Sequence, residues 1–434
     1  MRWRKSFAPA RMERVAVVAP IARMDAVLHV VAAHAAVEFD LPYPSGDGPE
    51  EFDRARDAAI VSGPLAGLVG WSPAHTLREL GEDLAPLGGG VVRLSHPSGV
   101  QPPTLLRATG PAATSRLLVD TYGTVPYADL DPSRLAGLAY ILMFGMMFGD
   151  VGHGALLVVV GLMLRNGWVN RLSRLHTAWR FVAGAGLTAM FFGLLYGEAF
   201  GPTGLVPVLW LNPLEEPIPL LLAAVLLGSA LLAGAYALGT VNRFREGGWG
   251  LALYSRTGVA GSLLFLGVAL LALGVTTGLT GLVVAAAGLG AVAVAFLSVG
   301  LYLEAGGGGA GIAQAVIEVF DTVIRLGSNI VSFARLAAFG LTHAALLMVV
   351  WNGTTALWAS DWRGAAAIVL FVVGNLLTFA LEALVAGIQA LRLEYYELFS
   401  RIFDSEGRPF RAWSPVPDPP QPSAPSPQPG TATK

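Results

Sequence analysis

The sequence contains no cysteine in its 434 residues, and only 13% of its residues are charged. The absence of cysteine excludes a disulfide framework and any cysteine-ligated metal site. Soluble domains carry about 25% charged residues, so this chain is not an ordinary soluble protein. A formal net charge of −2 provides no excess of basic residues for a nucleic-acid partner, and none is expected.

The sequence has instead an excess of apolar residues, which make up 54% of the chain. They are concentrated between about residues 136 and 402. We predict a small soluble cytoplasmic domain over residues 1–130 and a transmembrane domain over residues 131–404. A Pro-rich, disordered cytoplasmic tail is predicted over residues 405–434. The predicted fold is therefore mainly α, a polytopic membrane protein preceded by a small α/β unit.

The first 130 residues carry the signals of a small α/β unit. Residues 14–19 have strand composition, and residues 24–36 follow with helical periodicity. A charged stretch over residues 49–56 predicts a second helix. Pro20 and Arg23 interrupt the apolar run near the N-terminus, so a cleaved signal peptide is not expected.

The distribution of basic residues predicts about eight transmembrane helices with both termini in the cytoplasm, because loops rich in Lys and Arg stay cytoplasmic. Residues 136–165 are too short for two ordinary crossings and predict two short helices that turn near residues 149–154. The last two segments, about 312–353 and 364–402, are long and must tilt or kink. The loops expected in the cytoplasm contain Arg165, Arg171, Arg174 and Arg180, and then Arg243, Arg245 and Arg256.

Arg335 lies in the middle of a long apolar segment. Its guanidinium is effectively always charged, and holding a charge at membrane depth costs roughly 2.5–3.5 kcal/mol or more. Intramembrane ionisable residues usually mark an ion path. The sequence therefore points to Arg335 as the centre of a functional site.

Polar residues recur at helical spacing on both long segments, which places each set on one helical face. Such faces must be turned toward protein or water. Two facing stripes would form a polar seam. In the alternative interpretation, Arg335 with Glu382, or Arg392 with Asp321, form structural ion pairs. The first stripe comprises Asp321, Arg325, Ser328, Ser332, Arg335 and Thr342, with Asn329 and His343 beside it, and the second comprises Asn375, Thr378, Glu382, Gln389, Arg392 and Tyr396.

Asp150 and His153 lie three residues apart at a Gly-rich turn. This spacing is compatible with a proton relay or a metal site, but local helix capping is the preferred interpretation. No third ligand with suitable spacing appears, so neither a metal site nor a cofactor is predicted. Glu198, flanked by Gly197 and Gly201, is interpreted as a structural polar contact or a possible relay.

Four motifs together resemble a known family. They are the segments 144–154 (FGMMFGDVGHG), 195–201 (LYGEAFG), 332–344 (SFARLAAFGLTHA) and 391–400 (LRLEYYELFS). In order and spacing they are similar to the membrane stator subunit of V-type and A/V-type rotary ATPases, called subunit a or subunit I. The resemblance extends from about Pro103 to Trp413.

The resemblance implies a non-catalytic subunit that carries protons past a rotating proteolipid ring, while separate soluble subunits handle ATP. Arg335 then matches the stator arginine that faces each ring carboxylate, and Glu382 and Arg392 match a charged pair on the last helix. His343 and Asp321 also match family positions, and the stripes add Ser328, Asn329, Ser332 and Gln389 as candidates for proton translocation. The implied partners are the proteolipid ring, the peripheral stalk subunits, the soluble ATPase sector and the lipid bilayer of the plasma membrane.

One feature departs from the family pattern. Relatives carry a long N-terminal region with a coiled-coil arm that joins the peripheral stalks, whereas no sustained heptads appear in the first 130 residues. A shortened arm is therefore expected. Two other functions compete with the rotary interpretation. A secondary ion-coupled carrier would usually show two related halves, and a non-conducting scaffold would not need Arg335.

Overall fold

The computed structural model describes residues 8–42, 48, 50–96, 100–106, 112–166, 178–403 and 407–415. The chain folds into two compact units. An α/β unit combines residues 8–107 with the chain from residue 407 onward, and a helical unit comprises residues 108–406. Arg171, Arg174 and most of the predicted disordered tail lie outside the described residues.

The α/β unit contains a five-stranded antiparallel sheet in the order β2-β4-β1-β5, with β3 paired to β4. Val17 at the centre of β1 faces Leu68 on β4 and Val91 on β5. The elements are β1 (Met12–Pro20), α1 (Met24–His34), β2 (Glu38–Phe39), α2 (Glu50–Asp57), β3 (Ile60–Ser62), β4 (Leu65–Pro73), α3 (Leu77–Leu84) and β5 (Gly90–Arg93). The predicted strand over 14–19 and the helices near 24–36 and 49–56 are confirmed.

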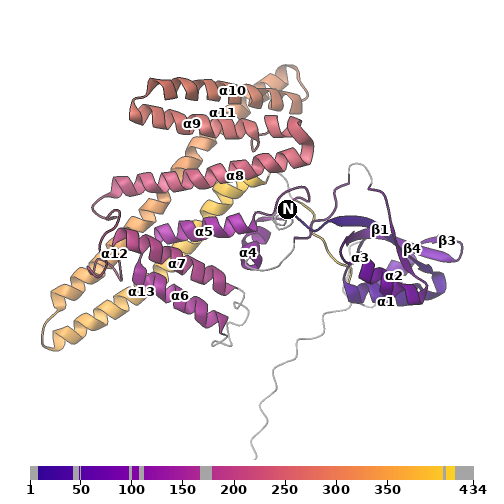
Figure 1. The fold of residues 1–434 in the computed structure, drawn as a ribbon, viewed down its shortest axis with the longest axis horizontal. Coiled ribbons are helices and arrows are strands. Elements are labelled where there is room, and N and C mark those ends of the chain that lie inside the picture. Colours follow the sequence, from indigo (N-terminus) through magenta and orange to yellow (C-terminus); the bar gives the residue numbers. More distant parts are fainter. Residues whose placement is uncertain are drawn as a thin grey trace, which may run out of the picture. The chain divides into compact units, whose positions relative to one another are not determined.

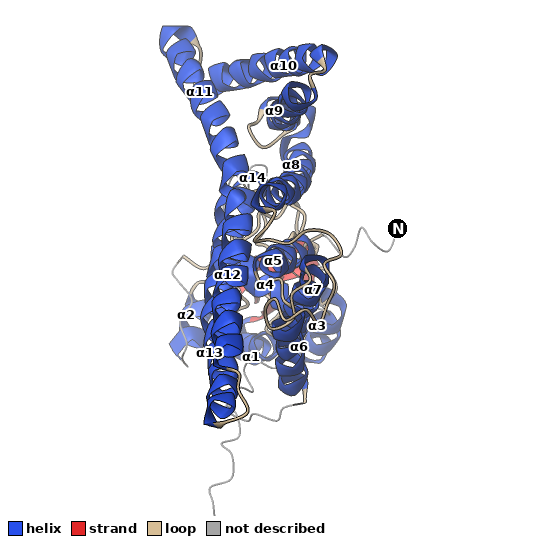
Figure 2. Cartoon of the chain, turned by 90° about the vertical axis from the view of Figure 1, so that its left-hand side faces the viewer, coloured by secondary structure: helices blue, strands red, loops and turns tan. Residues whose placement is uncertain are grey.

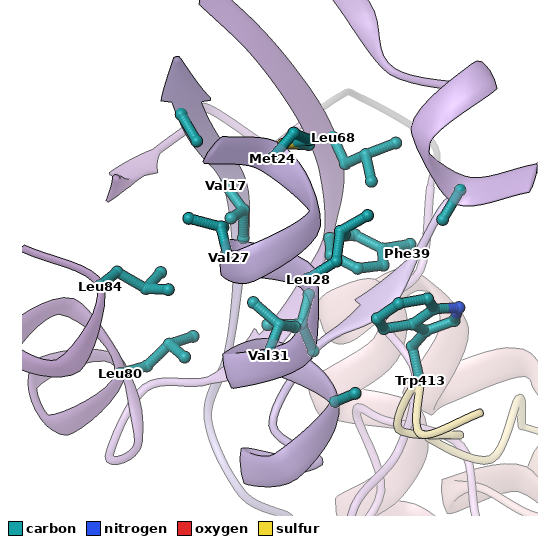
Figure 3. Packing of buried hydrophobic residues seen from close by; sticks show 14 of the residues in the cluster. Val17, Met24, Val27, Leu28, Val31, Phe39, Leu68, Leu80, Leu84 and Trp413 are labelled. Atoms are coloured by element: carbon teal, nitrogen blue, oxygen red, sulfur yellow. The ribbon is translucent and has the colours of Figure 1, made fainter. Parts of the chain in front are cut away.

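The core of this unit forms because one face of the sheet and one face of α1 are both apolar. Leu28 and Val31 on α1 are fully buried. Figure 3 shows the ring of Trp413 beside Phe39, facing the side chains of α1. Trp413 is 1% exposed and makes an edge contact with Phe39 at 5.3 Å between ring centroids. A residue far from the rest of the unit in sequence thus completes its core.

Residues 407–415 differ from the predicted disordered tail, because they pack against the α/β unit. The backbone N–H of Trp413 donates to the carbonyl of Val37 at 2.7 Å. Arg408 forms an ion pair with Glu38 at 2.9 Å, and the N–H of Arg411 donates to the same carboxylate at 2.8 Å. Ordering these residues costs conformational entropy. Burial of the tryptophan and a half-buried ion pair offset this cost, which the Pro-rich composition gave no reason to expect.

The helical unit consists almost entirely of long apolar helices (Figure 1). Helices α9 and α10 form an antiparallel pair, and so do α12 and α13. The elements are α4 (Ala112–Tyr122), α5 (Ser133–Met147), α6 (Val151–Arg165), α7 (Trp179–Tyr196), α8 (Pro217–Tyr254), α9 (Val259–Thr277), α10 (Thr280–Glu304), α11 (Gly308–Ser332), α12 (Ala334–Leu357), α13 (Trp362–Leu393), the π-helical turn η5 (Glu394–Phe399) and α14 (Ser400–Ile402).

Within the described residues, six helical segments are long and apolar enough to cross a membrane, and α5 and α6 are shorter apolar helices. Together they match the predicted mainly helical fold with about eight crossings, including the two short helices of the 136–165 block. Residues 148–150 make the turn between them, from Phe148, the C-cap of α5, to Asp150, the extended N-cap of α6. The fold class is therefore confirmed.

The first long segment, residues 308–357, is interrupted at a single residue. Helices α11 and α12 follow each other as one long rod in Figure 2, with α13 beside α12. Phe333 separates them, and its N–H donates to the carbonyl of Ile330, three residues back, at 3.2 Å. A three-residue hydrogen bond tightens the helix locally. The irregular turn therefore lies immediately before Arg335.

A buried charged cluster joins the loop before α5 to α8. Asp129 is fully buried, and Arg243 on α8 is 3% exposed. The guanidinium of Arg243 contacts Glu246 at 2.6 Å and Asp129 at 3.8 Å. Burial, together with the adjacent Glu246 carboxylate, raises the pKa of Asp129 to about 8. Glu246 is thus the principal counter-ion of Arg243, and Asp129 is favoured in its neutral form.

Replacing Asp129 with asparagine is expected to reduce the pH dependence of stability. The folded chain retains the proton on Asp129 up to about pH 8, whereas the unfolded chain releases it near pH 4. Folding stability therefore falls as pH rises through this window. Asp129→Asn stays neutral, so its Tm should exceed that of the wild type most at pH 8.5 and least at pH 4.5. Thermal unfolding of the full chain in detergent measures this.

The matched control is Asp57→Asn, because Asp57 is exposed on α2. This control should keep the pH profile of the wild-type chain. An Asp129→Asn profile parallel to that of the wild type would show that Asp129 is already ionised in the folded chain.

Candidate functional site

Arg335 lies in the first turn of α12 and is partly buried. Its Nη1 atom is buried and has no hydrogen-bond partner in the described part of the chain. No carboxylate of the described residues lies within 4.0 Å of its guanidinium. Glu397 on η5 interacts with it electrostatically. Arg335 is therefore held near an acid without being fixed in an ion pair.

Close packing between α8 and the start of α12 sets the position of Arg335. Phe333, two residues earlier, is fully buried. A Cβ atom at Gly228 on α8 would overlap the ring of Phe333, so the glycine is what permits this approach. The anchored phenylalanine fixes where α12 begins. This fixes the direction in which Arg335 leaves the backbone.

A polar cavity of about 440 Å³ lies on the α11 side of Arg335. Asn329 is six residues before Arg335, about 9 Å along a helix. With its amide oriented to satisfy both neighbours, it accepts from Arg401 Nη2 at 2.6 Å and donates to the carbonyl of Arg325 at 3.0 Å. Asp321 pairs with Arg325, one turn along the same helix. The cavity is lined by Arg256, Thr257, Asp321, Thr322, Arg325, Asn329, Tyr396, Ser400 and Arg401.

The region between this cavity and Arg335 is also polar. Glu397 interacts electrostatically with Ser332, Arg335, Arg392 and Arg401. It belongs to the π-helical turn η5, whose extra residue per turn changes which side chains face α11 and α12. The polar lining thus extends from the cavity toward the guanidinium.

A second polar cluster lies on the other side of Arg335. His343 is eight residues further along α12, about 12 Å at the rise of a helix, and is 1% exposed. Its Nδ1 atom lies 3.8 Å from Glu382 Oε2 on α13. His153 on α6 is fully buried, with its ring centroid 5.5 Å from that of His343. Three helices therefore meet at this cluster.

Asp150 has a structural role at the edge of this cluster. Its Oδ1 atom accepts from the N–H of His153 at 2.8 Å and from that of Phe200 at 3.0 Å. Its Oδ2 atom accepts from the N–H of Gly201 at 2.9 Å. The expected helix cap is present, and it also fixes a loop in which Phe200 has a φ of 52°.

Glu198 belongs to that same loop and is 4% exposed. Burial, with a further contribution from the charge of Asp150, raises the pKa of Glu198 to about 8. Its backbone carbonyl accepts from the N–H of Val151 at 2.9 Å, linking the loop to the start of α6. Glu198 thus combines a structural backbone contact with a carboxyl group favoured in its neutral form near neutral pH.

The structure does not form the two ion pairs considered as the structural alternative. Glu382 contacts His343, and Asp321 pairs with Arg325. The residues of each predicted stripe also differ in burial. Asn375, Thr378 and Glu382 are buried, whereas Ser328, Thr342 and Arg392 are exposed, and Gln389 is half-buried with its Oε1 atom unpartnered.

Sequence reasoning did not identify several residues that shape the site. Gly228 and Phe333 position Arg335, and Arg401 and Glu397 belong to its polar surroundings. Glu397 lies in the last of the four motifs, five residues after Arg392, which was the available signal. Phe333 lies in the third motif, two residues before Arg335, but nothing in that motif showed its packing against α8. Gly228 carried no signal, because a glycine in an apolar helix is not distinctive.

Taken together, the helices and the site define a multi-pass membrane protein with a charged residue held between two polar clusters. Residues 71–208 match the model of the V-type ATPase 116kDa subunit family. The chain is 27% identical to "A-type ATP synthase subunit I" of Pyrococcus horikoshii over 366 residues, which is 80% of this chain and 53% of that protein. It is 30% identical to the protein of that name from Aeropyrum pernix over 345 residues, 68% of this chain and 48% of that protein.

The chain is thus similar to the V-type ATPase 116kDa subunit family in one segment, and to proteins named "A-type ATP synthase subunit I" over most of its length. A protein named "V-type ATP synthase subunit I 2" from Treponema pallidum is 33% identical over 162 residues, 35% of this chain and 36% of that protein. The resemblance expected from the four motifs is thus confirmed. The chain spans about half the length of the curated relatives named "A-type ATP synthase subunit I" that it matches.

Proposed function

We propose that this chain is the membrane stator subunit of a V/A-type rotary ATPase. It would provide two proton half-channels and the arginine at which each carboxylate of a proteolipid ring gives up and regains its proton. The chain itself would not be the catalyst of ATP hydrolysis or synthesis. That reaction belongs to a soluble sector, to which peripheral stalk subunits would connect it.

The observation that carries the proposal is the placement of Arg335. A fixed cation without an ion-pair partner in the described residues can favour the charged form of a carboxylate that approaches it. The same carboxylate must be neutral when it passes through lipid, because a charge is strongly disfavoured there. A ring carboxylate would therefore release its proton near Arg335 and take up another when it leaves.

The two polar clusters supply the routes for these protons. The cavity lined by Asp321, Asn329 and Arg401, of about 440 Å³, has room for several water molecules on one side of Arg335. His343 and Glu382 are buried on the other side. Because the clusters lie on opposite sides of Arg335 along α11 and α12, a fixed positive charge separates them and opposes a direct leak. The first cluster would open to the cytoplasm and the second to the outside, with both termini cytoplasmic.

An apolar surface for the ring is also present. Val331, one turn before Arg335, is 69% exposed, and Leu384 and Ile388 on α13 are 62% and 56% exposed. Such faces are expected to contact either lipid or the apolar helices of a neighbouring subunit. The ring would therefore approach Arg335 along the α11–α13 side.

Affinity purification of the full chain from its native membrane tests this function. A stator subunit should bring with it a small proteolipid and nucleotide-binding subunits in constant ratio, and the preparation should hydrolyse ATP. Identification of the copurified chains by mass spectrometry gives the result. A secondary ion-coupled carrier or a non-conducting scaffold would not retain both kinds of subunit, so isolation of the chain without them would contradict the proposal.

A further inference from the structure

The cluster of His153, His343 and Asp150 contains an unexplained feature. Both ring nitrogens of His153 and both of His343 are buried and have no hydrogen-bond partner among the described residues. Buried polar atoms are normally satisfied by protein, water or a bound ion. Leaving each unsatisfied costs about 1–3 kcal/mol. Two imidazoles without partners at one place therefore call for a ligand.

Aromatic side chains fill most of the surroundings of the two imidazoles. Phe148 packs against both rings, at 5.7 Å from His153 and 4.8 Å from His343 between ring centroids. Phe379 and Phe200 lie 5.5 and 5.6 Å from the His153 ring. Asn375 interacts with the His153 side chain, but neither its Oδ1 atom nor either ring nitrogen of His153 forms a hydrogen bond of good geometry. An aromatic shell thus encloses the two imidazoles.

One donor atom from each of the three residues lies within 4.8 Å of the other two. Four-coordinate Zn²⁺ holds its nitrogen and oxygen ligands at about 2.0–2.2 Å, so that ligand atoms are about 3.4 Å apart. Small side-chain rotations would bring the three donors to this spacing. The carboxylate of Asp150 has about four lone-pair sites. Backbone N–H groups occupy three, leaving one for a metal.

Glu382 completes the arrangement. Its Oε2 atom lies 3.8 Å from Nδ1 of His343. A metal-bound histidine usually directs its second ring nitrogen at a carboxylate, which fixes the tautomer and orients the ring. With Nδ1 of His343 directed at Glu382, Nε2 is left for the metal. His343 is the third ligand, beside Asp150 and His153. The sequence could not show that it joins them, because His343 lies on α12, far along the chain from α6.

We propose that Asp150, His153 and His343 form a binding site for one divalent transition-metal ion of the Zn²⁺ type. Two imidazoles and one carboxylate suit zinc, and the fourth position would remain for water. A bound ion would join α6 to α12. It would also occupy His343, which the proposed function places in the proton path, so Zn²⁺ should inhibit proton transport.

Direct binding is the primary test, and it does not depend on the proposed function. The full chain, purified in detergent and freed of metal with a chelator, is titrated with Zn²⁺ by calorimetry. Co²⁺ is then used as a spectroscopic probe of four-coordinate geometry. One ion per chain is expected to bind, and His153→Gln and His343→Gln should each weaken binding by at least about 10-fold. His75→Gln, an exposed histidine of the α/β unit, is the matched control.

Several results would contradict the proposed metal site. No stoichiometric binding by the wild-type chain would do so, and so would equal affinity in both variants and the control. The unfolding temperature is measured for every variant. If one variant fails to fold, the other alone decides the matter. In the assembled complex, Zn²⁺ should inhibit transport by the wild type and by His75→Gln at a lower concentration than transport by His153→Gln. Binding without this inhibition would uphold the metal site and count against a proton path through His343.

Discussion

Replacing Arg335 with alanine is expected to reduce ATP-driven proton transport by the assembled complex at least about 100-fold. Near the guanidinium, the charged form of a ring carboxylate is favoured, and without it that carboxylate keeps its proton. A 100-fold reduction corresponds to about 2.7 kcal/mol, comparable to the cost of placing one charge in the bilayer. Acidification of vesicles containing the reconstituted complex, followed with a pH-sensitive dye, measures the transport.

Assembly should survive this change, because Arg335 forms no ion pair with the described residues whose loss would unfold the chain. Arg335→Lys keeps a charge but loses the planar fork of donors, and it should retain only a small fraction of transport. Arg363→Ala is the matched control, since Arg363 is exposed at the start of α13. Normal proton pumping by an assembled Arg335→Ala complex would refute the assignment of this arginine.

The same variant tests the separation of the two polar clusters. If the positive charge of Arg335 opposes a direct leak, its removal should also raise the passive proton permeability of vesicles that contain the complex without ATP. A loss of transport with no change in permeability would leave Arg335 as the partner of the ring carboxylate. It would then assign the barrier between the half-channels to apolar packing, such as that of Phe333 against α8.

Hydropathy and helical periodicity predict most of the fold, because the positions of spans depend on local composition. They predicted the two short helices α5 and α6 as well as the long final segments. They could not predict the docking of Trp413, because a lone tryptophan in a Pro-rich segment gives no periodic signal. Its burial beside Phe39 depends on a surface that only the folded α/β unit provides.

For the candidate site, the sequence identified the charged residues but not their partners. A helical stripe fixes which residues share a face, and Glu382 was placed on one face with Asn375 and Thr378, which the structure buries with it. Which acidic side chain contacts which basic one depends on the relative positions of α12 and α13 along their axes. Glu382 therefore faces His343 instead of Arg335. The contact between His153 and His343 has the same origin, since it requires α6 to meet α12.

Replacing Asp150 with alanine is expected to lower the free energy of unfolding by about 3 kcal/mol or more. The change removes a carboxylate that accepts hydrogen bonds from three backbone N–H groups, those of His153, Phe200 and Gly201. Each donor left buried and unsatisfied costs about 1–3 kcal/mol. The loop at Phe200 would also lose the contacts that hold its positive φ. Thermal and denaturant unfolding of the full chain in detergent measure the loss.

Asp361→Ala provides the matched control. Asp361 is also the N-cap of a helix, α13, but it is exposed and accepts from the N–H of Arg363, at 3.0 Å. Removing such a cap costs about 1 kcal/mol. Asp150→Asn should fall between the wild type and Asp150→Ala, because one side-chain oxygen can still accept the bonds from His153 and Phe200 while the bond from Gly201 is lost. An Asp150→Ala chain no less stable than Asp361→Ala would mean that the loop is held by its packing, and that Asp150 is free to serve the proton path or the metal.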